Sequence, residues 1–157
     1  MTEGLLQLAE EALTYMRRAS RGGVGKDDLP EPEIRKGADW QTLHDKGKKA
    51  IDLLPDLHKR QNYTLVVELS LYSMERLAEA AMKRNYYVAD STEHGRIFED
   101  AASLGVLDPE LAAYLSRLFR YRSQLYYRSG IGTRELSDKL SQLANGFYSL
   151  MSGGLTE

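Results

Sequence analysis

Apolar residues along most of this chain recur every three or four positions, the spacing that forms one apolar face on an α-helix. The first predicted helix runs from Gly4 to Arg18, and its apolar residues are Leu5, Leu6, Leu8, Ala9, Ala12, Leu13 and Met16. A second begins at Asp39, which can cap it, and runs to about Leu54, because Pro55 bends or ends a helix. The third and longest spans about Gln61 to Arg84, and its apolar stripe consists of Val67, Leu71, Met74, Ala78 and Ala81, with Leu77 beside it.

Three further helices are predicted after the third, each with start and stop signals at its ends. The first spans Asp90 to Gly105, with Glu93 placed as in a capping box. The next begins at Asp108-Pro109 and runs to about Ser129, where Gly130 and Gly132 end it. The last is capped by Thr133, ends at Gly153-Gly154, and has one face formed by Leu136, Leu140, Leu143, Phe147, Leu150 and Met151.

The segment between the first two helices, residues 20–38, is dense in glycine, proline and charge, so we expect an exposed loop there. Loops of this length in compact domains are often functional or disordered. The pattern therefore predicts an all-α, up-and-down helical bundle of about five or six helices. We expect a single domain over 1–157, in which 1–38 is an N-terminal helix plus a flexible Gly/Pro-rich loop and 39–152 is the bundle.

Composition narrows the environment and the chemistry. The chain has no cysteine, which excludes disulfides and thiolate metal sites. No stretch approaches the ~20 apolar residues of a membrane helix, and no signal-peptide pattern is visible, so we expect a cytoplasmic protein without a membrane contact. The formal charge of −2 means that any nucleic-acid contact would come from a local basic patch.

Familiar catalytic and cofactor motifs are absent from the sequence. The stretch Gly22–Lys26 is similar to the end of a phosphate-binding P-loop, but Ser20 and Asp27 stand where that motif needs a glycine and a hydroxyl residue. The histidines His44, His58 and His94 have no metal-ligand spacing, and no nucleophile elbow exists. We therefore expect no metal and no cofactor.

One arginine occupies a position that helical spacing assigns to a leucine. In the predicted fifth helix, Arg122 falls on the face that contains Leu111, Leu115, Leu118 and Leu125. At roughly 100° per residue, it lies within about 40° of the first three of these leucines. The helix's other arginines, Arg117, Arg120 and Arg128, fall on the opposite side. A charge on an apolar face is costly unless it is paired or lies at a wet interface.

The expected neighbours of Arg122 are Tyr126 and Tyr127 on its own helix, and an acid from a facing helix, for which Glu75 is the candidate. Two interpretations remain open. Arg122 is tethered in a structural hydrogen-bond network, or it forms an anion site, since a guanidinium forks onto phosphate oxygens.

The stretch Arg117–Arg128 resembles the hallmark region of the HEPN (higher eukaryotes and prokaryotes nucleotide-binding) domain, where an Arg is followed after four to six residues by a His. Arg122 takes the Arg position, and Tyr127 stands where the His would be. Upstream, Tyr72–Lys83 is similar to the family's Ala-x-Glu-Lys-x-x-Lys-Ala helix, with Glu75-Arg76 at its Glu-Lys pair. The segments 91–98 and 105–111 resemble the helix and link between these motifs, so the resemblance covers about residues 39–152.

The resemblance implies either of two functions. Many HEPN proteins are metal-independent endoribonucleases of toxin–antitoxin systems, beside a nucleotidyltransferase-type partner, and others are noncatalytic nucleotide- or RNA-binding modules. They typically form homodimers. Here Tyr127 replaces the His, and a phenol with a pKa near ~10 is a poor proton shuttle at neutral pH.

We therefore expect a noncatalytic, dimeric module that binds a nucleotide, RNA or a partner such as a nucleotidyltransferase-like protein around Arg122, Tyr126, Tyr127 and Glu75. One alternative is an endoribonuclease in which Arg122 acts with Tyr127, or with His94 brought near by folding. The other is a protein-interaction scaffold that docks its partner through the first loop.

Overall fold

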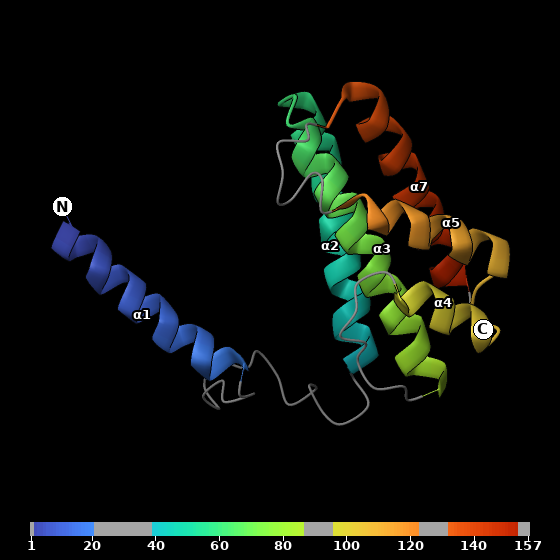
Figure 1. Ribbon diagram of the computed structural model, residues 1–157, viewed down its shortest axis with the longest axis horizontal. Coiled ribbons are helices and arrows are strands. Elements are labelled where there is room, and N and C mark those ends of the chain that lie inside the picture. Colours follow the sequence, from blue (N-terminus) through green and yellow to red (C-terminus); the bar gives the residue numbers. More distant parts are fainter. Residues whose placement is uncertain (1, 21–38, 87–95, 123–131, 154–157) are drawn as a thin grey trace. The chain divides into compact units, whose positions relative to one another are not determined.

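The structure is a computed structural model that describes residues 2–20, 39–86, 96–122 and 132–153. Every regular element within these ranges is an α-helix, which confirms the predicted all-α bundle (Figure 1). The chain divides into two compact units, residues 1–35 and 36–157. The predicted loop at 20–38 falls, apart from its first residue, outside the described residues, and the single-domain assignment stays a prediction.

The first unit contains one described helix, α1 (Thr2–Ser20), which extends slightly beyond its predicted bounds. Its predicted apolar stripe is exposed. Leu5, Leu6, Leu8, Leu13 and Met16 are each between 50% and 69% exposed. The apolar face of an amphipathic helix normally packs against another part of a protein. The exposed apolar face of α1 is therefore a candidate contact surface.

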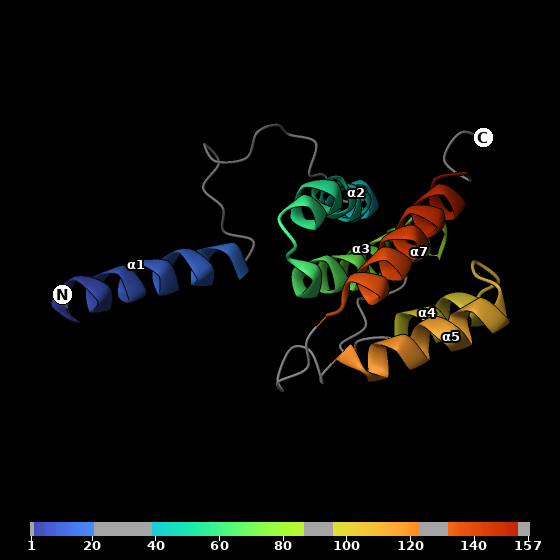
Figure 2. The ribbon, with the colours of Figure 1, turned by 90° about the horizontal axis from the view of Figure 1, so that it is seen from above.

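The second unit is built around one central helix (Figures 1 and 2). Its helices are α2 (Asp39–Lys59), α3 (Tyr63–Tyr86), α4 (Arg96–Ser103), α5 (Pro109–Arg120) and α7 (Arg134–Gly153). Helix α3 makes its most extensive contacts with α2 and α7 and also contacts α4, while α4 and α5 pack against each other. The turn between α2 and α3 contains Gln61 in the left-handed region, at φ 56°.

The core of this unit surrounds α3, which is buried on most of its circumference. Of its predicted stripe, Val67, Leu71, Met74, Leu77 and Ala78 are at most 2% exposed. The other helices contribute Leu54, Phe98, Leu115, Phe119, Leu140 and Phe147, among others. Phe98 packs edge-on against Phe119 and Phe147, with ring centroids 5.0 and 6.1 Å apart. None of the described helices is both long and apolar enough to span a membrane.

Three predicted helix boundaries with a capping signal are confirmed. The Asp108 side chain accepts a hydrogen bond from the Leu111 N–H at 3.0 Å, and Pro109 opens α5. The Thr133 hydroxyl accepts one from the Leu136 N–H at 3.2 Å. Gly105, at φ 75°, ends α4, and the N–H of the next residue bonds back across the turn at 2.9 Å. The predicted cap at Asp90 lies outside the described residues.

Two predicted helix ends were wrong. Helix α2 continues through the exposed Pro55 to Lys59. A proline removes only one backbone hydrogen-bond donor, and the hydrogen bonds of the neighbouring turns maintain the helix. Helix α5 ends at Arg120 instead of running unbroken to about Ser129. Its last turn tightens, since the Tyr121 N–H donates to the Leu118 carbonyl at 3.2 Å. No glycine or proline marks this stop.

The predicted apolar face of α7 was partly wrong. Leu140 and Phe147 are buried as expected, but Leu136 is 37% exposed and Leu150 is 54% exposed. The buried face is instead completed by Ser137 and Ala144, which are fully buried. Small residues at these positions allow α7 to approach the core closely.

Candidate functional site

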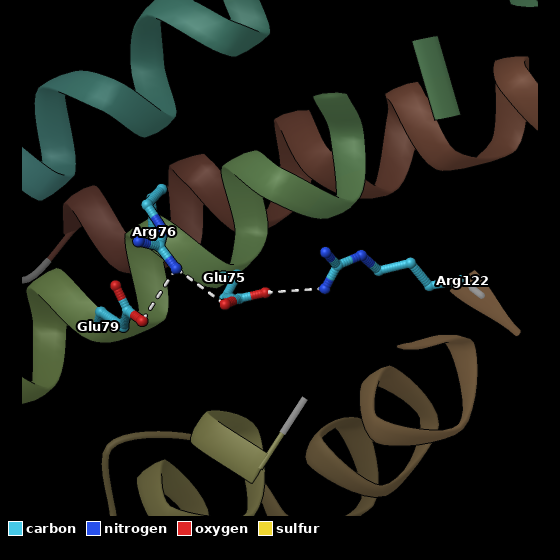
Figure 3. A network of polar contacts seen from close by, with 4 residues as sticks. All are labelled: Glu75, Arg76, Glu79 and Arg122. Carbon is cyan, nitrogen blue, oxygen red and sulfur yellow. Dashed lines mark hydrogen bonds and ion pairs between the residues drawn. The ribbon is translucent and has the colours of Figure 1, made fainter. Parts of the chain in front are cut away.

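Two glutamates lie on the buried side of α3, one helical turn apart. The side chains of Glu75 and Glu79 are 8% and 6% exposed. Two like charges at this spacing repel each other and are costly to bury. Arg76 compensates both, because its Nη2 donates to Glu75 Oε1 at 2.8 Å and to Glu79 Oε1 at 3.0 Å (Figure 3).

Arg122 joins this network from the chain that follows α5. Its side chain extends towards α3, with Nη1 3.9 Å from Glu75 Oε2 (Figure 3). Only 17% of the side chain is exposed. The predictions that Arg122 turns towards the apolar interior and faces an acid at Glu75 are confirmed. Arg117 and Arg120 are exposed, as expected for the opposite face.

The two arginines lie at different distances from the carboxylates of this network. Arg76 has close hydrogen bonds to two carboxylates, whereas the contact of Arg122 with Glu75 is longer than a hydrogen bond. The formal charges of these four side chains sum to zero. The Arg76 Nε–H is buried without a hydrogen-bond partner, and a water or a ligand oxygen commonly satisfies such a donor.

The aromatic half of the predicted site is not placed. Tyr126 and Tyr127 lie outside the described residues, so their role beside Arg122 stays a prediction. Another tyrosine does contact the network, since the Arg76 guanidinium carbon lies 5.5 Å from the centroid of the Tyr72 ring. Tyr72 is 38% exposed and connects the network to the surface of α3.

The described histidines have their contacts outside this network. His44 Nε2 lies 3.1 Å from the Ser152 hydroxyl, and burial lowers the pKa of His44 below 6.5. His58 Nε2 lies 3.0 Å from Asp138 Oδ1. His94 is outside the described residues. In the part of the chain that the structure describes, no cluster of acids and histidines could hold a metal ion.

Sequence reasoning did not assign Arg76 and Glu79 to the site. A signal was available, because Glu75 and Glu79 stand four residues apart on a helix that is apolar around them. Such a pair is stable in a core only with a cation between the carboxylates, and Arg76 is the adjacent cation. A pocket beside Trp40 was also missed, since its residues come from three helices that are distant in sequence.

Comparison with known proteins identifies the family. No curated protein and no solved structure matches the chain significantly. A protein family described as "Domain of unknown function (DUF8154)" matches residues 4–152. The match covers α1 as well as the helices around the Glu75–Arg122 network. The chain therefore belongs to the DUF8154 family.

Proposed function

We propose that this chain is a noncatalytic module that binds a phosphate group of a nucleotide or RNA at Arg122. The supporting observation is the guanidinium of Arg122, which lies 3.9 Å from the buried Glu75 carboxylate while 17% of the side chain is exposed. The resemblance to HEPN domains, in which an arginine occupies this place, supports the same proposal.

The geometry favours Arg122 over Arg76 as the group that meets the phosphate. Arg76 is engaged by two carboxylates at 2.8 and 3.0 Å, so an approaching anion would have to displace them. Arg122 is 3.9 Å from its acid, and a guanidinium presents five N–H donors. In this proposal Glu75 positions the guanidinium, and a phosphate oxygen accepts a hydrogen bond from it.

The chemistry around Arg122 supports binding more than cleavage. Endoribonuclease action through the ribose 2′-hydroxyl needs a group that transfers protons near neutral pH. His44 and His58 contact Ser152 and Asp138. The residue at the HEPN histidine position is Tyr127, whose phenol ordinarily titrates near ~10.

The proposal includes a homodimer in which α1 pairs with α1 of a second copy. Leu6, Ala9, Leu13 and Met16 repeat at alternating intervals of three and four, as in a coiled coil. In an antiparallel pair, Leu6 lies opposite Met16 and Ala9 opposite Leu13, so that each small residue meets a large one. A parallel pair would place Ala9 against Ala9 and leave a gap.

Light scattering tests this pairing. Leu13→Glu places a charge in the contact and should convert a dimer into a monomer. Thr14→Glu, on an exposed neighbouring position, is the matched control and should leave the mass unchanged. A Leu13→Glu protein that stays dimeric would exclude α1 as the contact. The HEPN resemblance also makes a nucleotidyltransferase-like protein the partner to test for co-purification.

The binding proposal is tested by titrating ATP and a short single-stranded RNA into the purified protein. Arg122→Ala should weaken binding by about tenfold or more, because a charge-assisted contact is lost. Arg120→Ala removes an exposed arginine of α5 and should change the affinity little. Equal affinities of the wild type and Arg122→Ala would reject the anion site.

An RNA cleavage assay distinguishes the binding proposal from the endoribonuclease alternative. An enzyme of this type would leave 2′,3′-cyclic phosphate ends, and both Arg122→Ala and Tyr127→Phe would abolish them. The proposal predicts that excess wild-type protein leaves the RNA intact. Cyclic ends that depend on both residues would replace the binding proposal with an enzyme.

A further inference from the structure

A pocket of about 110 Å³ is lined by residues of the first turns of α2, the last turns of α3 and the end of α7. Its wall has an apolar part and a polar part. The apolar part consists of Leu77, Ala80, Ala81 and Met151, and the remaining lining residues are Trp40, His44, Arg84 and Asn85. None of the four charged residues of the Glu75–Arg122 network lines it, so this is a separate site.

Arg84 is the charged group of the pocket, and an aromatic ring holds it in place. Its guanidinium carbon lies 5.0 Å from the centroid of the Trp40 ring. A cation–π contact uses the flat face of the guanidinium, so the N–H donors around its edge can still bind an acceptor. Within the described ranges, no carboxylate forms an ion pair with Arg84.

Three charged residues act on the His44 ring at the edge of the pocket. Arg84 and Lys48 both lie near enough to His44 to disfavour its protonation, while Asp45 opposes them. Lys48 and Asp45 are exposed, so water screens both. Arg84 is partly buried and is the charged residue that lines the pocket itself. The His44 ring and the Ser152 hydroxyl, 3.1 Å apart, add neutral polar groups.

We propose that this pocket binds a small organic carboxylate. The carboxylate pairs with the Arg84 guanidinium, and the carbon chain packs against Leu77, Ala80 and Met151. A cavity of about 150 Å³ can hold a benzene molecule, so the 110 Å³ pocket accommodates a chain of a few carbons. The apolar wall favours such a ligand over inorganic phosphate, which would leave that wall without a partner.

The protein carries its own reporter for this site, because Trp40 is the single tryptophan of the chain. Titration with sodium butyrate should change the Trp40 fluorescence in a saturable manner. Acetate should bind more weakly, because it buries fewer carbons. Inorganic phosphate should give no saturable change, and a phosphate response equal to that of butyrate would overturn the assignment of an organic ligand.

Two variants test whether butyrate binds in the pocket or only responds to surface charge. Calorimetry measures their butyrate binding, because a change at Arg84 also alters the surroundings of Trp40. Arg84→Met should weaken binding by about tenfold or more. Ala81→Leu fills the pocket without changing the charge and should also abolish binding. Arg120→Met, at an exposed position on α5, is the control and should bind butyrate as the wild type does. Wild-type affinity in Arg84→Met, or in a folded Ala81→Leu protein, would overturn the proposal.

Discussion

Glu75 connects the two arginines of the candidate site, since one carboxylate oxygen meets Arg76 and the other faces Arg122. The sequence could predict this acid because Arg122 needs a buried partner and α3 is the longest apolar helix. It could not predict that α5, which contains Leu118, ends before Arg122, because no glycine or proline marks the tightened turn at Tyr121.

Replacing Glu75 by glutamine should destabilise the fold by about 1.5 to 3 kcal/mol, because Arg76 and Arg122 lose a charged acceptor in a buried setting. Urea unfolding measures this change. Glu99→Gln, at an exposed position of α4, should shift the unfolding free energy by less than about 0.5 kcal/mol. Equal midpoints for Glu75→Gln and wild type would show that the network contributes little.

His44 should make the stability of the protein depend on pH. Burial lowers its folded pKa, and Lys48 and Arg84 lower it further, against the opposite effect of Asp45. The unfolded chain, with a His pKa near 6.5, therefore takes up a proton first as the pH falls. The contribution of His44 to the free energy of unfolding is fully present above pH 6.5, and it is lost as the pH falls from there towards the pKa of His44 in the folded protein.

The measurement is the urea midpoint of the wild type and of His44→Gln at about pH 7.5 and about pH 5.5. The wild type should lose more stability than the variant across this interval. Ser152, Tyr148 and the charged residues named above surround His44. If the wild type and His44→Gln lose the same stability between the two pH values, other groups cause the pH dependence.

At the scale of elements, the packing of α2 on α3 depends on a glycine. A Cβ at Gly47 would lie 2.8 Å from Leu77 Cγ and 3.1 Å from the Ser73 carbonyl oxygen. Periodicity predicted both helices but not this close approach, because a glycine inside a helix gives no sign of what faces it. The cap residues Asp108 and Thr133 were predictable, since their hydrogen bonds are local.

Gly47→Ala should lower the unfolding free energy by about 1 to 3 kcal/mol, because the added methyl group forces Leu77 and the α3 backbone to shift. The control is Gly146→Ala, at a glycine inside α7 with no atom near the added Cβ. This second change should raise stability by about 0.5 to 1 kcal/mol. Chemical unfolding measures the stability of both variants. A Gly47→Ala protein that is more stable than Gly146→Ala would contradict the close packing of α2 on α3.

At the scale of the molecule, the chain separates into a helix with an exposed apolar face and a unit with its own core. All residues of the core cluster lie between Ile51 and Phe147, within the second unit. The family match nevertheless extends over both units, from residue 4 to 152. The HEPN resemblance predicted from the sequence covers only about residues 39–152, because the motifs that carry it lie on the later helices.

A fragment of residues 36–157 should therefore fold without the first unit. Its urea midpoint should lie close to that of the full chain, because α1 supplies no side chain to the core cluster. Circular dichroism during unfolding measures this. An unfolded or strongly destabilised fragment would mean that the first 35 residues are needed for the core.

The central claim, that Arg122 meets a phosphate, is tested most directly by the salt dependence of RNA binding. Each phosphate contact adds about one to the slope of log affinity against log salt concentration. Arg122→Ala should therefore reduce this slope by about one, whereas Arg120→Ala should leave it near that of the wild type. An Arg122→Ala protein with the wild-type slope and affinity would contradict the account.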